Sequence, residues 1–356
     1  MTRVSVEMDG RGATGTYCED GGVPTAFEGD FATQAKHVRI ALKGGETRAR
    51  GETFRTWGTD SALANCAPMV VSPTPLPPPE KWPLGDFPGE VPRPFWEGHD
   101  DAIACWRHAW EVIGRSCLRQ PEEGSGFVRN YVYTPFGSCV FMWGTCFITM
   151  FGRYASHVFP FIEMLDNFYA KQDSDGFIPR QIDIHDGRSA FEKNDLSSVG
   201  GNLLAWAEWR NYEWTGDAAR LARVYPRLLA FHRWLRRHRT WKDGSYFSSG
   251  WGCGMDNIPR IDESRYNTAF DHGHLSFADV TLQQLTNARI LLKIADVLKS
   301  DEGAAELREE IKILDHIAND AMWDEEAGIY KDLDADGRRI ATEHIGAFWS
   351  DRKSVV

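Results

Sequence analysis

The spacing of apolar residues changes near residue 98, and from there on it is typical of α-helices. In the first helical segment, apolar residues recur at intervals of three or four: Ile103, Trp106, Trp110, Ile113 and Cys117. This interval puts apolar side chains on one face of a helix, where they can enter a core. We therefore predict an amphipathic helix that begins near residue 98.

The same interval recurs along the rest of the chain. It predicts helices at about 140–154, 158–171, 200–216 and 275–299, and a partner helix that carries Leu307, Ile311, Leu314 and Ala318. Gly216 should end the third of these, because glycine commonly ends helices. A short helix is expected at 217–224, and Pro226 should open the next one, since proline is tolerated in a first helical turn. The short link 300–302 predicts an antiparallel hairpin.

Successive helices with almost no strand pattern predict an all-α fold for residues 98–356. Two long segments, 172–198 and 240–274, interrupt the helices and are rich in Gly and Asp. Connections of this length in a compact domain are usually functional. We therefore look for candidate chemistry in these two loops.

The N-terminal part of the chain has a different pattern. Residues 1–66 are rich in Gly, Thr and charged residues, with short alternating stretches at Val4–Met8 and His37–Leu42 that predict strands. Residues 67–97 are rich in proline, which favours an extended linker or arm. The prediction is a β or irregular segment, a Pro-rich linker, and a helical domain.

Composition excludes some classes of function. Hydrophobic residues make up 42% of the 356 residues, which is enough for a sizeable core. The formal net charge of -11 and the lack of a Lys/Arg run argue against nucleic acid as a partner. The chain has no apolar run long enough to cross a membrane and no apolar signal core at its start, so we expect no membrane contact and a cytoplasmic location.

Cysteine and tryptophan carry further information. The seven cysteines are odd in number and show no CxxC pair, which predicts reduced structural thiols in a reducing compartment. The 14 tryptophans have two interpretations, which are core packing and a sugar site. A pyranose ring presents an apolar face that stacks on an indole, so the second interpretation stays open beside the first.

The loop 240–274 contains the strongest candidate for a catalytic group. Its segment SSGWGCGMDNIPR, residues 248–260, has three glycines that permit tight turns before Asp256. A carboxyl group held under Trp251 and Met255 would be partly desolvated, which raises its pKa and keeps the proton that a general acid needs. The alternative is a turn aspartate that accepts backbone N–H bonds.

The loop 172–198 offers groups that bind hydroxyls. Its segment KQDSDGFIPRQI, residues 171–182, contains Asp173, Asp175 and Arg180, whose planar guanidinium presents a fork of donors. The alternative is a helix end followed by a loop, with Arg180 in a salt bridge. A third segment, FDHGHLSFAD (270–279), has an HxH pair without a third spaced ligand, so we predict neither a metal nor another cofactor.

These segments together resemble a known clan of enzymes. The run 141–182, which begins FMWGTCFITMFGRY, together with GMDNIPR and FDHGHLSFAD, looks like the mannosylglycerate-hydrolase-like and trehalase-like glycosidases. Among these glycosidases, the segments resemble glycoside hydrolase family 63 and kindred bacterial glucosidases and mannosidases. The resemblance covers roughly residues 90–349.

The resemblance implies a fold and a mechanism. The fold is an (α/α)6 toroid of six helical hairpins with the site at its mouth. The reaction is hydrolysis of an α-glucosidic or α-mannosidic bond by inversion, with one carboxylic acid protonating the leaving oxygen and a second carboxylate activating water. By motif, Asp256 matches the acid, and the positions that match the sugar subsite are Trp143, Arg180, Gln181 and Asn257.

Other residues of these segments complete the predicted site. We expect Trp251 to be a stacking platform, and Asp175, Arg260 and His272 to bind the substrate, an oligosaccharide or small glycoside. The sequence does not identify the sugar or the oligomeric state.

This chain departs from the family pattern in two places. The family reads Trp-Asp where this chain reads Trp143-Gly144, and losing that polar contact costs about 1–3 kcal/mol of binding. The toroid also looks incomplete at its C-terminal end, where EHIGAFW (343–349) reads as the start of another helix. Glu343 lies in the wrong motif to be the family's general base, so we expect this chain to lack that base.

Two alternatives remain beside an active glycosidase. One is a catalytically impaired or truncated sugar-binding homologue that lacks the general base. The other is a different helical-toroid enzyme, such as a polysaccharide lyase or a terpene cyclase. Asp100-Asp101 resembles an acidic metal motif, but its third acidic residue is absent, and the acidic charge of the chain disfavours binding of uronates.

Overall fold

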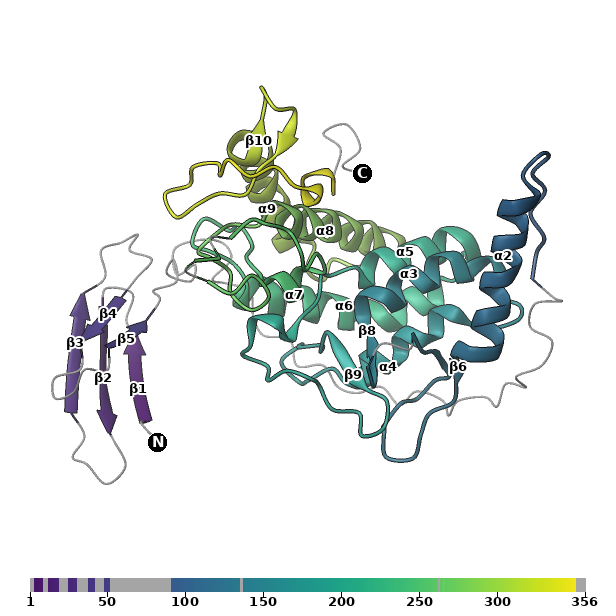
Figure 1. Cartoon of the computed structure of the whole chain (residues 1–356), viewed down its shortest axis with the longest axis horizontal. Coiled ribbons are helices and arrows are strands. Elements are labelled where there is room, and N and C mark those ends of the chain that lie inside the picture. The colour runs from purple at the N-terminus through teal and green to yellow at the C-terminus, as the bar shows by residue number, and fades with distance from the viewer. Residues whose placement is uncertain are drawn as a thin grey trace.

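A computed structural model gives the fold of the chain (Figure 1). It describes residues 91–134, 137–261, 263–264 and 266–349, together with five strands between residues 3 and 51. The N-terminal strands are β1 (Arg3–Met8), β2 (Gly12–Cys18), β3 (Thr25–Asp30), β4 (Val38–Ala41) and β5 (Arg48–Gly51).

The first three strands form one antiparallel sheet, and β4 pairs with β5. Both strands that the alternating pattern predicts are therefore confirmed, as β1 and β4. Most of the Pro-rich segment lies outside the described residues, and the division of the chain into three parts stays a prediction.

The rest of the described chain is mostly helical, as predicted, with a few short strands in two-stranded ladders. The principal helices are α2 (Asp100–Val112), α3 (Met142–Gly152), α5 (Leu204–Thr215), α6 (Ala218–His238), α8 (Ala278–Leu298) and α9 (Ala304–His316). Shorter ones are η4 (Phe161–Leu165), α4 (Asp166–Ala170), η5 (Leu196–Ser198), α7 (Gly250–Cys253) and η7 (Ile345–Phe348).

The helices pack as consecutive hairpins. Helices α3, α5 and α8 lie side by side, and each is followed along the chain by a partner that packs on it: η4 with α4, then α6, then α9 (Figure 1). Helix α6 also packs on α8, so that the partners form a second row. The two long loops follow the second-row helices α4 and α6, and they lead into the first-row helices α5 and α8.

Helix boundaries agree with the sequence prediction where glycine sets them. Gly216 takes a left-handed conformation (φ 70°), and its N–H donates to the carbonyl of Tyr212, which ends α5. The hairpin across 300–302 is also confirmed, since Lys299 ends α8 and Gly303 begins α9.

Three helix predictions are wrong. The segment 217–224 is not a separate short helix and Pro226 does not open the next one, because α6 runs unbroken from Ala218 to His238. A proline inside a helix costs about 3 kcal/mol. Burial of side chains on both sides of it, such as Tyr225 and Leu228, offsets this cost. The segment 158–171 is not one helix, because it starts with a turn up to Pro160 and then continues as η4 and α4.

The described cysteines are free thiols: Cys105, Cys117, Cys139, Cys146 and Cys253. Within the described part of the chain, no helix is both long and apolar enough to cross a membrane.

A buried cluster of charged groups joins α4, α5 and α6. Arg220 donates through two nitrogens to the carboxylate of Glu208, at 2.7 and 2.8 Å, and through Nη2 to Asp166 at 3.1 Å. Tyr169 donates its hydroxyl to Glu208 at 2.9 Å. All four side chains are buried. Removing one charged member would leave its partner buried without a counter-charge, so each member is important for stability.

We therefore predict that Arg220→Ala lowers the free energy of unfolding by about 3–5 kcal/mol, since it leaves Glu208 buried without its cation, while Asp166 keeps Arg129 at 3.4 Å. Chemical denaturation measures this loss. The matched control is Arg210→Ala, which removes an exposed arginine paired with Glu213 and should cost less than about 1 kcal/mol. Equal losses in the two variants would contradict the prediction.

Candidate active site

The two long loops meet, and Arg180 joins them. Its Nη1 donates to the backbone carbonyl of Trp251 at 2.6 Å. The hydroxyls of Ser197 and Ser249 form a second link at 2.8 Å, between η5 of the first loop and the residue that caps α7 in the second. The sequence motifs that contain Arg180 and Asp256 are therefore neighbours in the fold.

A short antiparallel pair of strands places Arg180 beside the start of α3. Strand β8 (Cys139–Phe141) pairs with β9 (Gln181–Asp183), with Phe141 opposite Gln181. The N–H of Met142 donates to the carbonyl of Arg180 at 2.8 Å. Arg180 also donates to the side-chain carbonyl of Gln181. This arrangement puts Arg180 and Gln181 beside the first turn of α3, which contains Trp143.

Aromatic rings surround the guanidinium of Arg180. It lies 4.8 Å from the ring centroid of Phe191 and 5.5 Å from that of Trp251. Phe270 packs on Trp251 with ring centroids 4.9 Å apart. Burial lowers the pKa of Arg180, while the charge of Asp256 opposes this change. The aromatic residues thus limit access of water to the arginine and hold its plane.

Asp256 follows a left-handed turn at the end of α7. Gly254 has φ 77° and ends this helix, so the chain reverses before Met255 and Asp256. The residue is exposed, yet neighbouring atoms desolvate its carboxyl group enough to raise its pKa above the usual value. The positive charge of Arg180 acts in the opposite direction. Desolvation is the larger of the two effects and favours the protonated acid.

Trp143 lies between two glycines that leave room for its ring. A Cβ atom on Gly254 would stand 2.8 Å from a ring atom of Trp143, and one on Gly201 would stand 2.4 Å from another. Such contacts are too short for carbon atoms. Glycine is therefore required at both positions, and the glycine-rich turn before Asp256 packs directly on Trp143.

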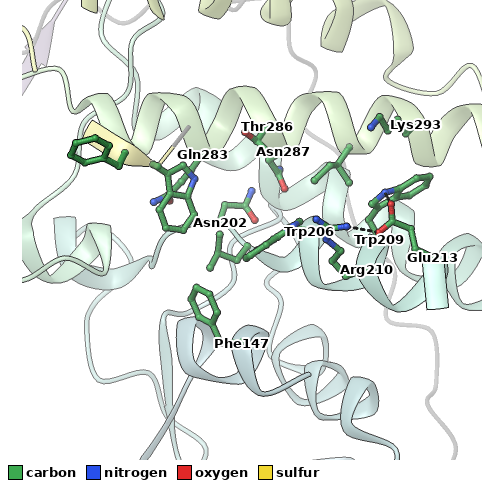
Figure 2. Close-up of a pocket in the computed structure, with 14 residues that line it drawn as sticks. Phe147, Asn202, Trp206, Trp209, Arg210, Glu213, Gln283, Thr286, Asn287 and Lys293 are labelled. Carbon is green, nitrogen blue, oxygen red and sulfur yellow. Dashed lines mark hydrogen bonds and ion pairs between the residues drawn. The ribbon is translucent and has the colours of Figure 1, made fainter. Parts of the chain in front are cut away.

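A cavity of about 380 Å³ lies between α5 and α8 (Figure 2), and aromatic contacts connect it with Trp143. Trp143 packs on Trp349 and Phe147, with ring centroids 5.4 and 5.5 Å apart, and Phe147 packs edge-on against Trp206 at 5.9 Å. Phe147, Trp206 and Trp349 all line the cavity. Its walls therefore offer indole surfaces of the kind that stack on sugar rings.

Buried amides of α8 face the same cavity. Gln283 is 2% exposed, and neither of its amide atoms has a hydrogen-bond partner among the described residues. Its Oε1 and the ring of Trp143 both lie within 2.6 Å of the point that a Cβ on Gly201 would occupy, so the two side chains are neighbours. One turn further along, Oδ1 of Asn287 also has no partner in the described part. Buried amides without partners are suited to bind hydroxyl groups.

Sequence reasoning did not identify Gln283 as a site residue. The available signal was a polar residue next to Leu282 and Leu285 in a strongly apolar helix. Trp349 and Phe191 were also missed, because neither lies in one of the three motifs 171–182, 248–260 and 270–279. Their places beside Trp143 and Arg180 depend on the fold.

Some predicted site residues have other partners. Asp175 binds Lys193 at 2.8 Å, together with Asp173, and the adjacent Gly176 lies against the backbone of α6. Glu343, which we did not expect to be a base, pairs with Lys331 at 3.5 Å. Asn257 is exposed beside Asp256.

Arg260 and His272 are buried. Arg260 is 6% exposed, and both of its terminal nitrogens donate to Asp279. His272 is 2% exposed and packs edge-on against Trp241 and Phe247. That these two residues and Asp175 bind substrate stays a prediction. Across the described ranges, no group of three or more His, Cys, Asp or Glu side chains is arranged to hold a metal ion.

The comparison with protein families identifies the domain. Residues 141–350 match the family model of the mannosylglycerate hydrolase MGH1-like glycoside hydrolase domain, and this match covers more than half of the chain. The chain belongs to this glycoside hydrolase family. The matched region contains α3, both long loops and Trp349, and therefore the whole candidate site.

A curated relative is an uncharacterized protein of Borreliella burgdorferi. It is 26% identical over 204 residues, which cover 57% of this chain and 40% of the relative. The chain thus spans less than half the length of the curated relative that it matches.

Solved structures show the fold. A GH63 mannosylglycerate hydrolase from Thermus thermophilus in complex with Tris has a TM-score of 0.51 and 20% identity, over 68% of this chain and 71% of that one. The same enzyme in complex with glucose has a TM-score of 0.50, 20% identity, and coverage of 68% and 70%. An uncharacterized conserved protein from that organism has a TM-score of 0.50, 21% identity, and coverage of 67% and 69%. The predicted (α/α)6 class is confirmed, and the described hairpins are part of such a toroid.

The packing of Trp143 on Gly254 gives a testable prediction. Gly254→Ala adds a methyl group against the indole, so we expect a lower melting temperature and a changed tryptophan fluorescence spectrum. Gly216→Ala is the matched control, because Gly216 also has a positive φ (70°) but has open space around its Cβ position. The control pays only the backbone strain, about 1 kcal/mol. If both variants lose the same stability, the proposed contact with Trp143 is not important.

Proposed function

We propose that this domain hydrolyses an α-glucosidic or α-mannosidic bond by inversion and that Asp256 is the general acid. The observation that carries the proposal is the environment of the Asp256 carboxyl group. Desolvation raises its pKa, it lies within the field of Arg180, and it follows a turn packed on Trp143. A protonated carboxylic acid beside a sugar platform is what leaving-group protonation needs.

The proposed roles of the neighbouring residues follow from their chemistry. Trp143 and Trp251 stack on sugar rings, while Arg180, Gln181 and Asn257 bind hydroxyls. Gln283 is added to this group, because its buried amide can both donate to and accept from a hydroxyl. Inversion also needs a carboxylate that activates water about 6.5–9.5 Å from the acid. Glu343 is not proposed for that role, since it pairs with Lys331.

The names of the structural neighbours guide the choice of substrates. Two of them are structures of a mannosylglycerate hydrolase, and one of these two contains glucose. Mannosylglycerate and small α-glucosides are therefore the compounds to test first on this chain.

A second candidate function is sugar binding without hydrolysis, and Gly144 favours it. The family resemblance expects an aspartate there, and a Cβ at Gly144 would have open space within 4 Å. The space for an anchoring side chain is thus present without the anchor. Calorimetry with α-linked disaccharides separates the two candidates, since heat of binding without release of sugar supports this second one.

Asp256→Asn tests the acid directly. The amide cannot donate a proton to the glycosidic oxygen, so we expect kcat to fall by at least about a hundredfold while the protein stays folded. Released sugar is the readout. Glu263→Gln is the control, because Glu263 is a carboxylate of the same loop that bonds to Thr268, and its change should leave kcat within about twofold. Unchanged turnover in Asp256→Asn excludes Asp256 as the acid.

The pH dependence of kcat tests the influence of Arg180. A general acid must be protonated, so activity falls as pH rises through the pKa of Asp256, which is raised. The cation of Arg180 stabilises the carboxylate and lowers this pKa. Arg180→Gln should therefore move the alkaline limb of the kcat profile to higher pH, whereas KM rises because a hydroxyl ligand is lost. A limb that moves to lower pH would contradict the assignment.

A further inference from the structure

A buried ionic cluster lies behind the loop that carries Asp256. At its centre, Arg260 donates from Nη1 and Nη2 to the two carboxylate oxygens of Asp279, each at 2.8 Å. Its Nε lies 3.5 Å from Asp332. The guanidinium also stands 4.1 Å from the ring centroid of Phe277. The plane of Arg260 is thus fixed by two carboxylates and an aromatic ring.

Asp332 extends the cluster in two directions. Its Oδ1 accepts from the N–H of Ala278 at 2.7 Å, and so it caps α8, whose own preceding residue supplies no side-chain cap. Its Oδ2 bonds to Nε2 of His344 at 3.1 Å. Burial raises the pKa of Asp332, but Arg260 and His344 more than reverse this, and the net pKa lies below the usual value. Asp332 is therefore an ionised carboxylate that holds three segments together.

The cluster connects both sides of the candidate active site. Arg260 comes four residues after Asp256, and its N–H donates to the carbonyl of Ile258 in a tight turn. On the other side, His344 begins the segment that reaches Trp349 through η7, and Trp349 packs on Trp143. A Cβ on Gly346 would stand 3.2 Å from the carboxylate of Asp279, so this segment rests directly on the cluster.

We propose that Arg260, its two carboxylate partners and His344 form a positioning device for the substrate site. The device fixes two parts of the chain relative to each other: the loop that contains Asp256, and the segment 344–349, here called the Trp349 wall because its last residue lines the cavity. This inference rests on the proposed function of Asp256 as general acid. Because both of its terminal nitrogens are bound to Asp279, Arg260 is given a positioning role here in place of the substrate contact that the sequence predicts. Its effect reaches the reaction through the placement of the carboxyl group of Asp256.

Geometry explains why an arginine stands here. The two terminal nitrogens of its planar guanidinium match the two oxygens of Asp279, and Nε remains for Asp332. A lysine has a single ammonium group, which cannot form the two parallel bonds to Asp279 and also reach Asp332 in this geometry. Lysine keeps the positive charge, so the buried carboxylates are not left without a cation. Arg260→Lys therefore changes the geometry of the cluster more than its charge.

The test combines hydrogen exchange with kinetics on the full chain. In Arg260→Lys, exchange of the backbone amides in 250–260 should become about tenfold faster, while that of α6 should not change. With mannosylglycerate or an α-glucoside as substrate, kcat should fall by about ten- to a hundredfold with KM within about threefold, because the acid is displaced while the sugar ligands remain. The matched control is Arg289→Lys, which alters the pair with Asp315 at 2.5 Å between α8 and α9. It should change neither the exchange of 250–260 nor kcat.

Asp332→Asn is the second variant and keeps the pair of Arg260 with Asp279. It should speed exchange mainly in 344–349 and raise KM more than it lowers kcat, because the Trp349 wall loosens while the acid stays in place. Unchanged exchange of 250–260 in Arg260→Lys overturns the proposal, as does a loss of kcat that only follows the loss of folded protein. If the parent chain hydrolyses none of the α-glycosides, the proposed function fails, and the exchange measurements still decide whether the device exists.

Discussion

The hydrogen bond from Arg180 to the carbonyl of Trp251 is the constraint on which the candidate site depends. It joins two loops that are far apart in sequence, and its 2.6 Å length places the guanidinium where its charge acts on Asp256. The same arginine is tied through its own backbone carbonyl to the start of α3. One residue thus connects the start of α3, which contains Trp143, with the aromatic rings around Trp251 and with the candidate acid.

Buried arginines have distinct tasks in this fold, and their neighbours define them. Arg220 neutralises Glu208 and Asp166 where three helices meet, so it contributes to the packing of the hairpins. Arg260 neutralises Asp279 and Asp332 behind the loop of Asp256. Arg180 is only half-buried and faces aromatic rings. Among these three, it is the arginine with the access that a ligand requires.

The indole of Trp143 connects the site with the cavity between α5 and α8. It lies against Gly254 of the turn before Asp256, and it also packs on Phe147, which lines the cavity and contacts Trp206. Gln283 adds a buried amide at this junction. An indole with a buried amide beside it is compatible with the glycoside hydrolase family to which the chain belongs.

The sequence by itself determined the helical class, the positions of most helices and the two loops that contain the candidate site residues. These features follow from local rules, namely the spacing of apolar residues and the freedom of glycine at Gly216 and Gly254. The motifs also identified Asp256, Arg180 and Trp143 as a group. The structure shows them near one another around the turn before Asp256.

Only the tertiary structure decided the rest, because it depends on contacts between residues distant in sequence. Pro226 lies inside a helix because burial of α6 outweighs a local cost. The sequence predicted that Arg260 and Arg180 both bind substrate. In the fold, Asp279 and Asp332 surround the guanidinium of Arg260. The sequence does not distinguish Gln283 from other polar residues of a helix, and only the packing of the fold places it beside Trp143. A side chain's chemistry is local, whereas its partners are set by the packing of the whole domain.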